Sequence, residues 1–167
     1  MSVWLTETEF RHSGALAAGI TINVAFLQEI KNDNLPLRQL IDTVAKDFRH
    51  YPPMQPQTAM ELLYRVREEL ETYFALEEQL GYFNQAALHN PSVSRCAAAL
   101  MSEHEQLFLQ LNDVIERVEQ VVYRETEANM SEVDTLFQQF RSELALHEQC
   151  EMELMMKFCN EEFGVGD

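Results

Sequence analysis

Apolar residues recur three or four positions apart over four long stretches of the chain, which is the spacing of one face of an α-helix. These stretches cover about residues 21–48, 58–88, 93–127 and 132–162. Val, Ile and Thr never alternate with polar residues over the length of a strand, so no strand is expected. The pattern predicts an all-α protein.

Proline-rich or polar segments separate the four stretches. They are YPPMQPQ at 51–57, HNPS at 89–92 and NMS at 129–131, where Ser131 is in position to cap the last helix. Because these connections are short, neighbouring helices should run antiparallel. The simplest architecture is an up-down-up-down four-helix bundle over residues 21–163, with residues 1–20 as an N-terminal arm.

The first predicted helix contains an interruption, DNLP, at residues 33–36. A proline inside a helix removes one hydrogen bond and clashes with the carbonyl group four residues earlier. We therefore expect a kink before Pro36, or a new helix whose N-terminus is capped by Asn34.

Composition and charge narrow the class of protein. The chain has 167 residues, 46% of them hydrophobic, which suits one domain with one core. A formal charge of −16 would repel phosphate backbones, so nucleic acid is not an expected partner. No apolar run approaches the roughly 18 residues of a membrane span. The absence of a secretory signal and the three scattered cysteines, read as reduced thiols, predict a cytoplasmic protein.

Four ionisable residues break the amphipathic pattern because they fall on the apolar faces. His147 and Glu151 are neighbours on one face of the last helix, and Glu77 and His104 lie in line with the apolar residues of the second and third helices. A buried carboxylate or imidazole costs several kcal/mol unless it is paired or binds a metal. We therefore predict that the four side chains meet inside the bundle.

Two interpretations of this cluster remain open at the level of the residues. Two carboxylates and two neutral imidazoles suit iron, manganese or zinc. The same groups can also form a hydrogen-bonded network with no metal, and HxxxE on one helix is a weak motif by itself.

The order of the motifs resembles that of the hemerythrin-like proteins of the HHE cation-binding type. The similar segments are FLQEIKNDNLPLRQLI, YFALEEQL, SEHEQL and LHEQCEMEL, which together extend over about residues 24–160. In that family two carboxylates bridge two iron ions and histidines complete the ligand set. The resemblance implies Glu77, His104, His147 and Glu151 as metal ligands.

Two positions depart from the family pattern, and they are additional candidates for the site. Asn34 stands where the first helix would carry a histidine, and Tyr73 stands where the second would. Tyr73 can bind iron as a phenolate, donate a hydrogen bond to Glu77 or to a metal-bound water, or fill a site that binds nothing. With four ligands left, we expect a mononuclear or incomplete di-iron centre, or no cofactor.

The resemblance implies a protein that senses, stores or handles iron, O2 or NO, and enzymatic turnover of an organic substrate is not favoured. The alternative is a metal-free, degenerate hemerythrin-like bundle that acts as a protein-interaction module with an unknown partner. A third, weaker hypothesis is an oxidase-type enzyme that uses open metal positions, but no residue pattern identifies a substrate pocket.

Overall fold

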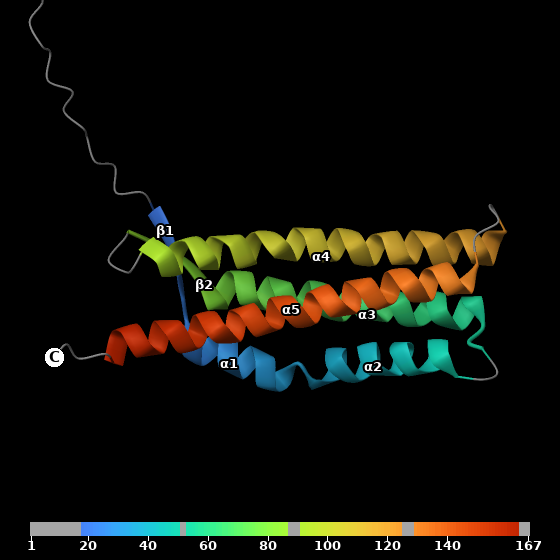
Figure 1. Cartoon of the computed structure of the whole chain (residues 1–167), viewed down its shortest axis with the longest axis horizontal. Coiled ribbons are helices and arrows are strands. Elements are labelled where there is room, and N and C mark those ends of the chain that lie inside the picture. The colour runs from blue at the N-terminus through green and yellow to red at the C-terminus, as the bar shows by residue number, and fades with distance from the viewer. Residues whose placement is uncertain (1–17, 51–52, 87–90, 125–128, 164–167) are drawn as a thin grey trace, which may run out of the picture.

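The computed structural model describes residues 18–50, 53–86, 91–124 and 129–163, which form long helices and one pair of short strands (Figure 1). In chain order the elements are β1 (Ala18–Ile22), α1 (Val24–Asp33), α2 (Leu35–Arg49), α3 (Pro56–Leu76), a π-helical segment η1 (Glu77–Gly81), β2 (Tyr82–Ala86), α4 (Pro91–Tyr123) and α5 (Met130–Phe163). The predicted all-α class is confirmed in this sense: helices build the molecule.

The prediction that the chain has no strand is wrong. β1 and β2 pair antiparallel from Ala18 opposite Ala86 to Ile22 opposite Tyr82. The second helix therefore ends well before the predicted residue 88. Each strand is short and its partner lies far away in the chain, so the local sequence does not mark either segment as a strand. Residues 1–17 of the predicted arm lie outside the described residues, as do residues 89 and 90 of the predicted break at 89–92. The rest of that break, Pro91 and Ser92, begins α4.

The predicted interruption of the first helix is real. Asn34 ends α1 and begins α2, and Pro36 lies in the first turn of α2, where a missing N–H costs little. The predicted capping role of Asn34 is wrong, because its side chain makes no capping hydrogen bond. The side chain is buried instead, and its Nδ2 has no hydrogen-bond partner.

The N-terminus of α5 is capped by a residue other than the predicted Ser131. The Oδ1 atom of Asn129 accepts hydrogen bonds from the backbone N–H groups of Ser131 (3.0 Å) and Glu132 (3.2 Å). Asn129 thus satisfies two of the donors that a helix start leaves free.

The helices lie side by side, with α1 and α2 end to end along one edge of the molecule (Figure 1). Within the described residues, two apolar clusters fill the interior. The larger joins α2, α3, α4 and α5 and includes the fully buried Leu63, Leu111 and Phe137. The smaller lies near the strands and includes Leu27 and Leu100. No helix in the described part of the chain has the length and apolar character to cross a membrane.

Candidate metal centre

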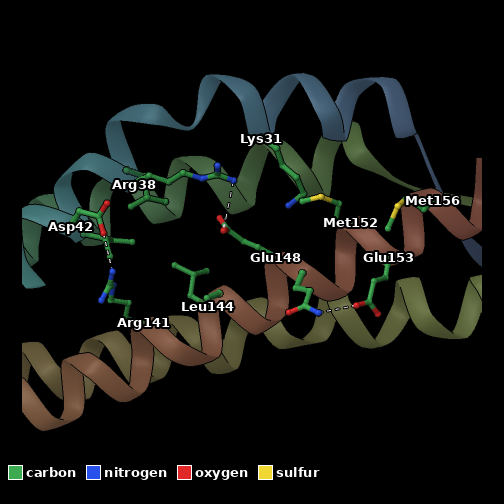
Figure 2. Close-up of a pocket in the computed structure, with 13 residues that line it drawn as sticks. Lys31, Arg38, Asp42, Arg141, Leu144, Glu148, Met152, Glu153 and Met156 are labelled. Atoms are coloured by element: carbon green, nitrogen blue, oxygen red, sulfur yellow. Dashed lines mark hydrogen bonds and ion pairs between the residues drawn. The ribbon is translucent and has the colours of Figure 1, made fainter.

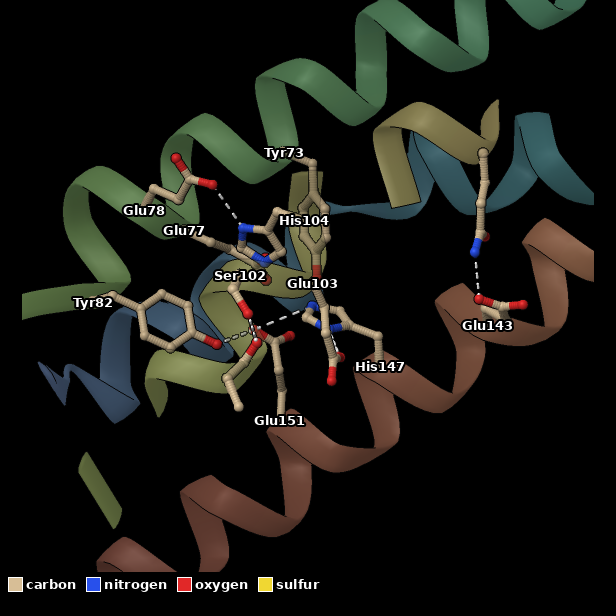
Figure 3. Close-up of polar contacts among 12 residues, drawn as sticks. Tyr73, Glu77, Glu78, Tyr82, Ser102, Glu103, His104, Glu143, His147 and Glu151 are labelled. Atoms are coloured by element: carbon tan, nitrogen blue, oxygen red, sulfur yellow. Dashed lines mark hydrogen bonds and ion pairs between the residues drawn. The ribbon is translucent and has the colours of Figure 1, made fainter. Parts of the chain in front are cut away.

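The four predicted ligand residues come together where the two apolar clusters meet. Glu77, His104, His147 and Glu151 each offer one ligand atom, and these atoms all lie within 4.8 Å of one another. Figure 3 shows the four side chains turned toward one another from η1, α4 and α5. Each residue is at most 2% exposed, so the predicted convergence is observed in a dry interior.

Helix periodicity positions three of these residues. His104 lies between the buried Leu100 and Leu107 on α4. His147 and Glu151 are four residues apart on α5, so they project from one face. Each therefore shares the inward direction of its apolar neighbours.

Glu77 is positioned by a π-helical turn. η1 begins at Glu77, and the backbone N–H of Tyr82 bonds to the carbonyl oxygen of Glu77 five residues earlier. Such turns are often found at functional sites. The turn ends at Gly81, where a Cβ atom would lie only 2.9 Å from Cγ of Leu27 and closer still to its Cδ2. Close packing against α1 thus requires glycine at this end of the turn.

Each imidazole is oriented by a second carboxylate that was not among the predicted ligands. Nδ1 of His104 lies 2.9 Å from Glu78, and Nδ1 of His147 lies 2.9 Å from Glu103. Because an ionised carboxylate only accepts hydrogen bonds, each Nδ1 carries the proton and each Nε2 points inward. Metal-binding histidines typically donate their other ring N–H to a carboxylate in this way.

The inward-facing atoms lack hydrogen-bond partners. Both Nε2 atoms and both carboxylate oxygens of Glu77 are buried without one. The nearest approaches are 3.3 Å between His104 Nε2 and Glu77 Oε2, and 3.7 Å between His147 Nε2 and Glu151 Oε1. An unpartnered buried polar atom costs about 1–3 kcal/mol, and a cation among these atoms would remove that cost.

The electrostatic surroundings favour ionised Glu77 and positive charge beside it. Burial raises the pKa of Glu77, but the interactions with His104, Lys31 and Tyr73 outweigh burial and hold that pKa below its usual value. Burial lowers the pKa of His104, but Glu77 and Glu78 outweigh it and raise that pKa. An environment that attracts a proton to His104 attracts a metal ion for the same reason.

Lys31 is a site residue that the sequence did not predict. It comes from α1, is 5% exposed, and donates a hydrogen bond to Glu151 Oε2. Its Nζ also lies 3.1 Å from the hydroxyl oxygen of Tyr73 and 3.6 Å from Glu77 Oε1. Its spacing, four residues after the buried Leu27, was the available signal.

Tyr73 lies in the site as a hydrogen-bonded phenol. Its hydroxyl oxygen accepts a hydrogen bond from Lys31, a partner that none of the three interpretations included. Burial raises the pKa of Tyr73 above its ordinary value, and the negative charges of Glu77 and Glu151 raise it further. Tyr82, also missed, donates to Glu151 Oε1, and burial together with Glu151 raises its pKa.

Asn34 lies apart from the clustered groups. It borders a pocket of about 250 Å³ that Pro36 and Tyr73 also line. Among the described residues, no hydrogen bond joins Asn34 to the two histidines or the two glutamates. Lys31, one turn earlier on α1, reaches the carboxylates instead.

Two surface pockets approach the cluster from different sides. Lys31, Arg38 and Glu148 line a pocket of about 610 Å³ between α1–α2 and α5, where Arg38 and Glu148 form an ion pair at 3.7 Å (Figure 2). His147 and Glu103 line a second pocket of about 270 Å³ between α4 and α5. The lysine side and the histidine side of the cluster thus face separate pockets.

Comparisons of the chain with protein-family models, with curated proteins and with solved structures found no match. The functional interpretation therefore depends on the site's own geometry and chemistry.

Proposed function

We propose that the chain is a hemerythrin-like, up-down-up-down four-helix bundle that binds a non-haem metal ion, iron, through Glu77, His104, His147 and Glu151. The observation that carries the proposal is the set of unpartnered atoms: two imidazole Nε2 atoms face two carboxylates in a buried space. These ligand types suit Fe2+, Mn2+ and Zn2+, and the carboxylates behind the imidazoles complete an arrangement typical of metal sites.

The proposed role is to sense, store or handle iron, O2 or NO in the cytoplasm. A non-haem Fe2+ ion with four protein ligands keeps one or two positions for water or a small molecule. The ring of Phe74 stacks on that of His104 with centroids 4.1 Å apart, so the surroundings of the imidazole are tight and apolar. Such a space fits a diatomic ligand better than an organic substrate.

Lys31 supports a second candidate function. Its ammonium already supplies positive charge to Glu77 and Glu151 without any metal. In this alternative the cluster is a structural network and the protein is an interaction module for an unidentified protein partner. The two candidates differ in whether the imidazole Nε2 atoms bind an ion.

Metal analysis of the intact protein distinguishes the candidates. We expect protein purified without oxygen from iron-fed cells, or reloaded with Fe2+, to hold about one ion per chain. His104→Ala and His147→Ala should lose that ion while circular dichroism stays helical, whereas the exposed His50→Ala should keep it. Wild-type protein that takes up no Fe2+, Mn2+ or Zn2+ after anaerobic loading would contradict metal binding and support the network.

A further inference from the structure

The two carboxylates of the cluster divide their oxygens between two sides. On one side, Glu77 Oε2 and Glu151 Oε1 face the imidazole Nε2 atoms at 3.3 Å and 3.7 Å. On the other side, Glu77 Oε1 lies 3.6 Å from Lys31 Nζ, and Glu151 Oε2 accepts a hydrogen bond from the same nitrogen. The carboxylates therefore border two adjacent cation positions, and Lys31 occupies one of them.

The position of Lys31 Nζ has the composition of a cation site in its own right. It has three oxygen neighbours: Glu151 and Tyr73 accept hydrogen bonds from it, and Glu77 Oε1 lies at ion-pair distance, 3.6 Å away. The side chain of Lys31 is 4% exposed, and those of both glutamates are fully buried. Oxygen atoms that surround a buried ammonium group could also coordinate a divalent metal ion.

We propose that the ammonium of Lys31 occupies the second of two cation positions bridged by Glu77 and Glu151, so that the protein binds one metal ion per chain, paired with a lysine. This inference rests on the proposed function, because it assigns the metal to the histidine side. It explains why the carboxylate oxygens face two cation positions, whereas the imidazole nitrogens face only one of them.

Charge supports the exclusion of a second ion. Together, Glu77, Glu151 and Lys31 carry one net negative charge, and a divalent ion on the histidine side would reverse it to one net positive charge. A second divalent ion beside the ammonium would add two more positive charges in a buried space, where like charges repel strongly. The second metal can bind only where Lys31 is absent. A single iron ion exchanges one electron between its common oxidation states, which fits sensing or storage better than two-electron oxidation.

The test replaces the lysine by a ligand. In Lys31→Glu, a carboxylate oxygen would end one bond short of the former ammonium nitrogen and leave space for an ion. Lys46→Glu makes the same charge change at an exposed site on α2 and serves as the control. Wild type and both variants, purified in the presence of Mn2+, are dialysed against Mn2+ without oxygen; bound metal is measured by mass spectrometry, and electron paramagnetic resonance detects exchange-coupled ions.

We expect about one Mn2+ per chain in wild type and Lys46→Glu, and about two, with an exchange-coupled signal, in Lys31→Glu. Lys31→Gln, whose side chain is neutral and as long as that of glutamate, is measured alongside and should also admit a second ion, but bind it more weakly. If circular dichroism shows that Lys31→Glu does not fold, Lys31→Gln decides the result. Two ions in wild type, or a single ion in the folded Lys31 variants, would overturn the inference and leave the proposed function standing. Wild type that binds no ion would overturn both.

Discussion

Glu78 and Glu103 are the residues on which the orientation of the two imidazoles depends. Their side chains are 46% and 42% exposed, so each can be changed with little effect on packing. Because they hold the Nδ1 protons in place, Glu78→Ala and Glu103→Ala should each weaken metal binding about 10- to 100-fold. Titration with Co2+, followed by its visible absorption, would measure this, with the exposed Glu105→Ala as the control. Equal affinity in all three variants would contradict the orienting role.

Lys31 makes a prediction about stability that needs no metal. Lys31→Met would leave Glu77 and Glu151 buried without their cation, which should lower the free energy of unfolding by about 3–5 kcal/mol. Urea unfolding of metal-free protein, followed by circular dichroism, measures the change. The exposed Lys46→Met should stay within about 0.5 kcal/mol of wild type.

A second substitution tests the cause of that loss. Glu77→Gln in the Lys31→Met background removes one of the two uncompensated charges, so the double variant should recover part of the lost stability. No recovery would mean that the packing of the lysine stem, rather than its charge, supports the site.

The sequence predicts some site residues and not others for a physical reason. Glu77, His104, His147 and Glu151 were predictable because each interrupts an apolar face at helical spacing. Lys31 lies on such a face too, but lysine is almost never fully buried unless it is paired. Its partners are Glu77 of η1, Glu151 of α5 and Tyr73 of α3, so the sequence near Lys31 gives no sign of them.

The elements around η1 show where helix periodicity fails. The apolar pattern of the second stretch continues past Glu77, which predicts an unbroken helix, yet a π-turn and β2 follow. The wider turn changes the direction in which later side chains point. Leu80 follows Glu77 by three residues and would share its inner face in a regular α-helix, but it is 41% exposed. The pairing with β1 and the contact between Gly81 and Leu27 are both non-local. The long helices were predictable because their signal is local, whereas this corner was not.

The contact at Gly81 yields a prediction at the scale of this element. Gly81→Ala would place a methyl group against the buried Leu27, and such overpacking typically costs about 1–3 kcal/mol. Urea unfolding should show that loss. In the Leu27→Ala background the same substitution should cost less, because the clashing side chain is gone. Additive costs in the double variant would mean that the backbone of η1, rather than Leu27, resists the change.

Across the whole molecule, the candidate centre joins elements that are far apart in the chain. Lys31 belongs to α1, Glu77 to η1, His104 to α4, and His147 and Glu151 to α5. The cluster also lies between the two apolar cores, since His104 is flanked by Leu100 of the smaller and Leu107 of the larger. Global unfolding separates all of these elements and with them the ligand set, so metal binding should be linked to global unfolding.

That linkage gives a prediction for the melting of the intact protein. A ligand that binds only the folded state at 100 times its dissociation constant adds about 2.7 kcal/mol to stability. Saturating Fe2+ or Mn2+ without oxygen should therefore raise the melting temperature of wild type, and a chelator should reverse the shift. Calorimetry measures both.

His147→Leu separates the metal from the packing. The substitution replaces an imidazole whose Nε2 is buried without a partner by an apolar side chain of similar size, and Glu103, left behind, can turn to solvent. The metal-free variant should therefore melt close to, or above, metal-free wild type. It should also lose the upward shift on adding metal, because a ligand is gone. A wild-type melting temperature that changes with neither metal nor chelator would mean that the buried cluster is structural, with the ammonium of Lys31 balancing its carboxylates.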